Sequence, residues 1–155
     1  MPDRTTIAEF LAARDVGFVG VSRNPKAFAN SVFRELRSRG WHPVPVHPEL
    51  AEVDGVPAVA SVAALPVGID RVIVMVGAER AAAVVEECAA RGVTQVWLHR
   101  GAGPSSVSAD AVARARDAGM ALVDGACPLM WAEPVRGIHR FHRLFAGRRI
   151  PVAAG

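Results

Sequence analysis

The sequence predicts an α/β protein built on a doubly wound, parallel five-stranded sheet. Three segments with helical patterning, rich in arginine and alanine, each end at a glycine, and a short apolar run follows each glycine. The apolar run at residues 71–76 is almost unbroken, which is typical of a strand buried on both faces of a sheet. In a chain of 155 residues, this alternation indicates one domain of βαβ units with right-handed crossovers.

The elements are predicted in alternation along the chain. Thr5 or Thr6 caps a first helix that runs to about Arg14. Glycine ends helices readily, and it closes three later helices, predicted at residues 29–39, 79–91 and 106–118. The strands are predicted, in order, at residues 16–21, 41–46, 71–76, 95–98 and 120–123. Proline and glycine punctuate the stretch after the second strand, where a short strand near residues 56–59 and a small helix around Val62 are expected.

The doubly wound topology predicts the spatial order of these strands. Numbered along the chain, they are expected in the order 3-2-1-4-5. A ligand would then bind at the carboxyl ends of the strands, near the switch point between the first and fourth strands. This Rossmann-like domain covers residues 1–130, and a basic helical tail covers residues 131–155.

The tail carries the excess positive charge. Residues 135–155 contain five arginines and no acidic residue, so subtracting them from the net charge of +3 leaves −2 for the rest. A short amphipathic helix is predicted from Ile138, Phe141, Leu144 and Phe145. We expect the tail to pack on the domain or on a partner, and a homodimer would cover Trp131, Phe141 and Phe145.

The composition excludes several classes of protein. Hydrophobic residues make up 51% and charged residues 21%, as in ordinary globular proteins. No apolar run reaches the roughly 18 residues of a membrane span, and the N-terminus lacks the order of a signal peptide. Two cysteines, Cys88 and Cys127, are too few for a disulfide framework. We therefore expect a cytoplasmic protein with neither a membrane nor a nucleic acid as partner.

A loop with phosphate-binding chemistry follows the first predicted strand. Gly20 lets the backbone approach a ligand, and Ser22 can donate to a phosphate. Arg23 and Lys26 add positive charge, and Pro25 bends the chain before the next helix. A plain strand-to-helix turn is the alternative interpretation.

The end of the second strand narrows the choice of nucleotide. A dinucleotide dehydrogenase usually has Asp or Glu there, which binds the ribose 2′-hydroxyl. This chain has His47-Pro48, so NAD is not expected. NADP stays possible, because arginine can hold its 2′-phosphate.

Three segments together resemble the CoA-binding domain family. They are Gly20-Val21-Ser22-Arg23-Asn24-Pro25, Pro45-Val46-His47-Pro48 and Val96-Trp97-Leu98-His99. Members of that family are small Rossmann-like proteins, similar to the N-terminal domain of the succinyl-CoA synthetase α subunit. The resemblance covers about residues 15–130 and implies coenzyme A or an acyl-CoA as the ligand.

The resemblance also implies a role for each segment. The phosphates of the ADP half of CoA would be held by Gly20, Ser22, Arg23, Asn24, Pro25 and Lys26. The adenosine would lie against Val46, His47 and Pro48. The pantetheine arm would pass Val76, Gly77, His99, Arg100 and Gly101. The chain departs from the family's usual residues at His47, at Gly77-Ala78 and at His99-Arg100.

No catalytic set and no metal site are predicted. The chain lacks nucleophile-elbow, Walker and zinc-protease motifs, and it has no tyrosine for a dehydrogenase pair. His139 and His142 could share a helix face, but no acidic residue or cysteine lies near them in sequence. Cys127 either packs in the core or presents a thiol near the cleft.

The residues thus favour a protein that binds CoA or an acyl-CoA and catalyses nothing by itself. One alternative is an enzyme, either an NADP-linked oxidoreductase or a CoA-ligase-related subunit whose catalytic partner is another chain. A second alternative is a regulatory or interaction protein that uses the basic tail at residues 136–149.

Overall fold

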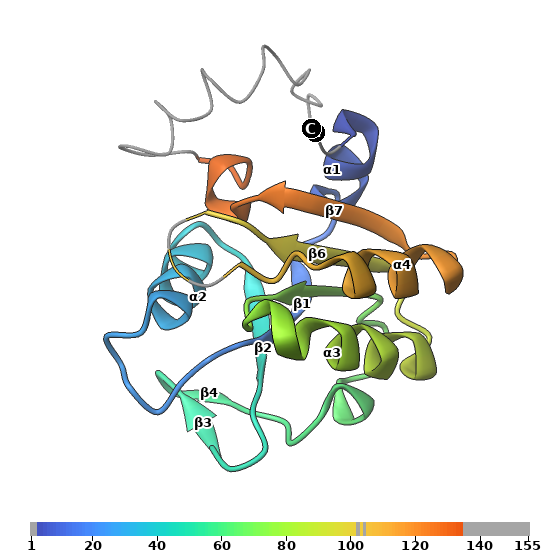
Figure 1. The fold of residues 1–155 in the computed structure, drawn as a ribbon. Coiled ribbons are helices and arrows are strands. Elements are labelled where there is room, and N and C mark those ends of the chain that lie inside the picture. The colour runs from blue at the N-terminus through green and yellow to red at the C-terminus, as the bar shows by residue number, and fades with distance from the viewer. Residues whose placement is uncertain (1–2, 102, 104, 135–155) are drawn as a thin grey trace.

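A computed structural model describes residues 3–101, 103 and 105–134 of the chain (Figure 1). The helices are α1 (Arg4–Leu11), α2 (Phe28–Ser38), α3 (Ala78–Arg91) and α4 (Ala109–Asp117), with two 3₁₀ turns, η1 (Val62–Ala64) and η2 (Pro128–Met130). The strands are β1 (Asp15–Val19), β2 (His42–Val46), β3 (Glu52–Val53), β4 (Val56–Pro57), β5 (Arg71–Val74), β6 (Gln95–His99) and β7 (Ala121–Ala126). Among these described helices, none is long and apolar enough to cross a membrane.

The main sheet confirms the predicted fold class. It has five parallel strands in the order β2-β1-β5-β6-β7, and β3 and β4 form a separate hairpin. Val59 forms an isolated parallel bridge with Val46, so the short segment after β4 lies outside β2. This segment holds the third place of the 3-2-1-4-5 pattern, and β7 extends the pattern at the other edge.

The prediction that the strand at residues 71–76 takes the third place in this order was wrong. The run at residues 71–76 contains β5, which pairs with β1 at the centre of the sheet instead of lying outside β2. The reason is its burial on both faces, which an edge position does not provide. The switch point therefore lies between β1 and β5.

Side chains alternate between two cores, one on each face of the sheet. Phe18, Ile73 and Trp97 point to the face covered by α1 and α2. Their neighbours Val19 and Val74 point to the face covered by α3, α4 and η1. Figure 1 shows α3 and α4 together on one side of the strands and α2 on the other. Because helices pack on both faces, the carboxyl ends of the strands lie between α2 on one face and α3 on the other.

The helix ends follow the predicted chemistry with one correction. Gly92 ends α3 with a positive φ of 81°, and Gly40 and Gly119 follow α2 and α4 with φ of 79° and 69°. The first helix is capped by Asp3 rather than by threonine, because the Asp3 carboxylate accepts the Thr6 amide at 3.1 Å. That helix is also shorter than predicted and ends at Leu11.

The chain beyond β7 packs on α2. Trp131 was expected to be exposed but is buried in the same core as α1 and α2, since Arg39 anchors this segment. The buried Arg39 donates to the carbonyl oxygens of Leu129 and Ala132. The predicted tail helix, its arginines, the homodimer contact and the pair His139 and His142 lie outside the described residues.

Candidate functional site

A cleft of about 610 Å³ opens at the carboxyl ends of β1, β2 and β5. Residues 19–22, 46–49 and 75–77 form its floor and rim. Residues 60–62, together with Arg80, Val84 and Glu87 of α3, form the remaining wall. The cleft thus lies at the switch point of the sheet, where doubly wound folds bind ligands. Its volume is in the range of small-molecule sites.

The structure divides the predicted site residues into three groups. Those that line the cleft are Gly20, Ser22, Val46, His47, Pro48, Val76 and Gly77. Those in the exposed loop beyond the cleft wall are Arg23, Asn24, Pro25 and Lys26. Those at the end of β6 or just after it, which are absent from the lining, are His99, Arg100 and Gly101.

Only glycine fits at position 20, because the backbone of Met75 lies too close for a side chain. Its φ is +131°, and a Cβ there would lie 2.4 Å from the carbonyl oxygen of Met75. The Met75 amide donates to the carbonyl oxygen of Val19 at 2.7 Å, which brings the two strand ends together. The close backbone approach predicted at Gly20 is therefore to Met75, the residue just after β5.

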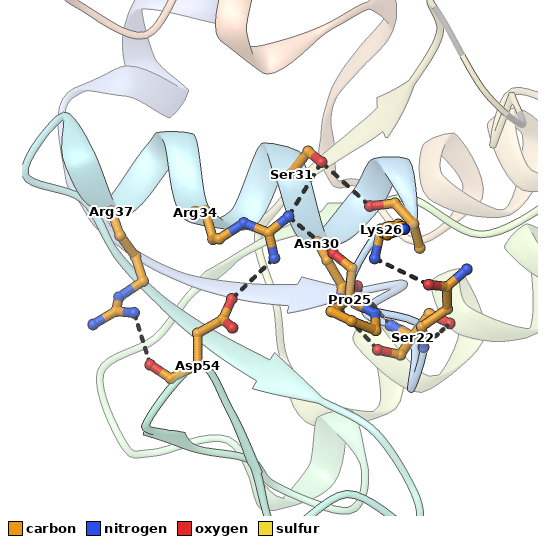
Figure 2. Close-up of polar contacts among 10 residues, drawn as sticks. Ser22, Pro25, Lys26, Asn30, Ser31, Arg34, Arg37 and Asp54 are labelled. Carbon is orange, nitrogen blue, oxygen red and sulfur yellow. Dashed lines mark hydrogen bonds and ion pairs between the residues drawn. The ribbon is translucent and has the colours of Figure 1, made fainter.

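The loop after β1 is held by its own side chains and by α2 (Figure 2). The Asn30 side chain accepts the Ser22 amide and donates to the Ser22 carbonyl oxygen, both at 2.8 Å. Ser22 Oγ accepts the Asn24 amide at 3.1 Å, and Asn24 Oδ1 accepts the Lys26 amide at 3.0 Å. In the loop predicted to bind phosphate, the amides of Ser22, Asn24 and Lys26 are thus already hydrogen-bonded. The Ser22 hydroxyl hydrogen is left to donate into the cleft.

Arginines of α2 join this loop to the β3–β4 hairpin (Figure 2). Arg34 donates to the carbonyl oxygen of Pro25 at 2.9 Å and pairs with the Asp54 carboxylate at 3.3 Å. Arg37 donates to the Asp54 carbonyl oxygen at 3.0 Å. The loops after β1 and β2 therefore share one support, which fixes the width of the cleft on this side.

His47 shapes the turn at the end of β2. Its Nδ1 accepts the amides of Glu49 and Leu50 at 3.0 and 3.1 Å. Because Nδ1 is the acceptor, Nε2 carries the hydrogen and is the ring nitrogen that can donate to a ligand. The imidazole thus holds the turn after β2, in addition to the predicted contact with adenosine.

Charged residues that the sequence analysis missed also line the cleft. Glu49, Arg80 and Glu87 are all in the lining, and Arg23 forms an ion pair with Glu49 across the mouth. Arg80 could have been predicted from the sequence, because it lies in the first turn of the helix that follows a central strand. Glu49 was missed because the position examined for an acidic residue was that of His47-Pro48.

At the end of β6, His99 and Gly101 lie on the α2 side of the sheet. The His99 ring is fully buried and packs on Phe28, with 5.6 Å between the ring centroids. Cys127 is buried in the same core, and this burial raises the pKa of its thiol. Gly101 lies between them, since a Cβ on it would be 3.2 Å from His99 Cε1 and 3.4 Å from Cys127 Cβ. The packing interpretation of Cys127 therefore agrees with its surroundings.

Within the described part of the chain, no three His, Cys, Asp or Glu side chains come together in a way that could hold a metal ion.

Comparison with solved structures shows the same architecture in archaeal proteins. A conserved hypothetical protein of Pyrococcus furiosus is 27% identical, with a TM-score of 0.67 over 74% of this chain and 95% of that one. A hypothetical protein of Pyrococcus horikoshii OT3 is 26% identical, with a TM-score of 0.74 over 95% and 97%. Both matches extend over nearly the whole length of the relative.

A larger protein contains the same fold. The acetyl-coenzyme A synthetase 1 of Ca. Korarchaeum cryptofilum, in complex with phosphate and ADP, is 22% identical, with a TM-score of 0.66. The match covers 77% of this chain but 27% of that one, so the fold is one part of the synthetase.

A family model described as a CoA-binding domain matches residues 14–132. This range runs from the start of β1 through η2 and includes every residue that lines the cleft. It agrees with the range expected from the three sequence segments. This chain therefore belongs to the CoA-binding domain family.

Proposed function

We propose that this protein binds coenzyme A or an acyl-CoA, with the nucleotide half of the ligand in the cleft at the switch point. The observation that supports this most is the cleft itself, lined by the ends of β1, β2 and β5 in a chain of this family. An open crevice at this edge of a doubly wound sheet is the usual place for a nucleotide.

The lining suggests how the ligand would lie. The adenosine would pack on Val46 and Pro48, with His47 Nε2 as a donor. The diphosphate would lie between the Ser22 hydroxyl and the Arg80 guanidinium, which line the same cleft from the loop after β1 and from α3. Here side chains are the main phosphate donors, because the amides of Ser22, Asn24 and Lys26 are already bonded.

The rest of the ligand would follow the strand ends. Val76 and Gly77 offer an apolar path for the pantetheine arm next to the diphosphate. The loop cations Arg23 and Lys26 are exposed at the mouth, where a phosphate on the ribose would come close. His99, Arg100 and Gly101 would be reached by the distal end of the arm.

We also propose that binding, without catalysis, is the activity of this chain. Among the described residues, the polar groups of the cleft are Ser22, His47, Glu49, Ser61, Arg80 and Glu87. His47 Nδ1 is already bonded to backbone amides, and Glu49 is paired with Arg23. This leaves no paired nucleophile and base at the strand ends.

Calorimetry with CoA, acetyl-CoA, NADP and ATP tests the ligand. CoA or acetyl-CoA should bind most tightly and should raise the melting temperature by mass action. The variant Ser22→Glu places a carboxylate beside the diphosphate and should weaken CoA at least about tenfold. Ser38→Glu adds the same charge at the far end of α2 and should leave the affinity unchanged.

Two results would contradict the proposal. Tight binding of NADP with no binding of CoA would favour an NADP-linked oxidoreductase. Equal weakening by Ser22→Glu and Ser38→Glu would place the ligand somewhere other than this cleft.

A further inference from the structure

The mouth of the cleft carries an ion pair between two loops. Arg23, in the loop after β1, pairs with Glu49, in the turn after β2. Both side chains are largely exposed, at 65% and 61%. Exposed pairs of this kind contribute little to stability, so a ligand can displace one partner at small cost.

The backbones on both sides of this pair are held in place. The turn that carries Glu49 is bonded to His47 Nδ1 through the Glu49 amide. The loop that carries Arg23 is bonded to Asn30 through Ser22 on one side and closed by Asn24 on the other. The fixed backbones therefore keep Arg23 and Glu49 opposite each other. Their long, exposed side chains can still rotate toward another charged group.

The pair lies near the end of β2, where the ribose of a bound nucleotide would be expected. In doubly wound folds that bind dinucleotides, an acidic residue near the end of the second strand binds the ribose 2′-hydroxyl, or a nearby arginine accommodates a 2′-phosphate. Here Glu49 lies three residues beyond the end of β2 and lines the cleft, and Arg23 is its ion-pair partner. The two side chains act on a ribose phosphate in opposite directions, since one attracts it and the other repels it.

We infer that the Arg23–Glu49 pair sets the preference of the cleft for a nucleotide with a 3′-phosphorylated ribose over the same nucleotide with a free 3′-hydroxyl. Arg23 leaves Glu49 and pairs with the phosphate when such a ligand binds. Glu49 competes for Arg23 and repels the phosphate, which limits the preference. This inference rests on the proposed function, because it assumes that the nucleotide half of CoA binds here.

The test is the ratio of two affinities, those for CoA and for 3′-dephospho-CoA, measured by calorimetry on the full chain. Glu49→Gln should raise the preference for CoA by about threefold or more, and Arg23→Gln should lower it by a similar factor. Both effects should shrink as the salt concentration rises. Glu52→Gln and Arg116→Gln remove the same charges at exposed positions outside the cleft and should leave the ratio unchanged.

The outcomes separate this inference from the proposed function. If the wild-type protein binds CoA but neither cleft variant changes the ratio, the inference is wrong and the proposed function stands. A lower preference for CoA in Glu49→Gln would also overturn it. If the wild-type protein binds neither nucleotide, the proposed function fails and the inference falls with it.

Discussion

At the scale of single residues, close neighbours restrict the side chains at Gly20 and Cys88. Gly20 lies where β1 meets the backbone of Met75, with a φ that L-residues rarely adopt. Cys88 is buried in the core between α3 and the sheet. Each leads to a prediction with a matched control.

Gly20→Ala should lower the free energy of unfolding by about 3 kcal/mol or more, because the new methyl group meets the Met75 carbonyl in a strained backbone. Gly55→Ala is the control, since Gly55 also has a positive φ of 79° but has open space around it. Its loss should be about 1 to 2 kcal/mol. Urea denaturation measures both, and equal losses would contradict the close approach to Met75.

Cys88 should make the protein less stable in alkali. Burial raises the pKa of its thiol from 9.0 to about 12. Between these pH values the unfolded chain ionises and the folded chain does not, so stability is full below pH 9 and falls as pH rises, by up to about 1.4 kcal/mol per pH unit. Burial also raises the pKa of the Cys127 thiol, so this second cysteine adds to the same decline.

Denaturation at several pH values tests this effect. Cys88→Ala should make the decline above pH 9 shallower, and the remaining decline comes from Cys127. Val85→Ala, a buried apolar truncation in the same helix, should lower stability at every pH and keep the slope. The effect would be disproved by equal slopes in the wild-type protein and Cys88→Ala.

At the scale of elements, α2 organises the loop that follows β1. Asn30 is 3% exposed and bonds both the amide and the carbonyl of Ser22. It is the buried polar side chain through which the helix holds the rim of the cleft. A rigid rim reduces the entropy that a ligand must overcome on binding.

Asn30→Ala should lower stability by about 2 kcal/mol, because it leaves an amide and a carbonyl without partners. The Ser22 and Asn24 amides should exchange their hydrogens faster, and CoA should bind more weakly. Ser31→Ala changes the next, exposed position of the same helix and should stay within about 0.5 kcal/mol of the wild-type protein. Slow exchange at Ser22 in Asn30→Ala would show that the helix does not hold the loop.

At the scale of the whole molecule, two buried arginines fasten peripheral segments to the sheet. Arg71 of β5 donates to the carbonyl oxygens of Glu9 and Phe10 at the end of α1. Arg39 donates to Leu129 and Ala132 after β7, at 2.9 and 2.7 Å. Each arginine thus connects two segments that are not paired as strands, through hydrogen bonds to backbone carbonyl oxygens.

Arg39→Met should lower stability by about 3 kcal/mol and expose the segment after β7 to protease, because two buried carbonyls lose their donor. Arg37→Met removes an exposed arginine of the same helix and should cost less than about 1 kcal/mol. Equal protease resistance in the two variants would show that the segment is held by its apolar contacts alone.

The sequence by itself determined the alternation of elements, the parallel sheet and the general place of the cleft. These features depend on local patterns, such as the aliphatic run of β5 and the glycines that follow the helices. The residues that line the cleft in β1 and β2 were also within reach, because strand ends in a βαβ unit meet at one edge.

Only the tertiary structure decided which strand lies beside β1 and which side chains line the cleft. Arg80, from α3, and Glu49, beyond the expected position, enter the cleft through packing between segments far apart in the chain. In the same way, the amides of the first loop turned out to be occupied by Asn30 and by the loop's own side chains. The physical reason is that hydrogen-bond partners and burial depend on non-local contacts, which no local pattern encodes.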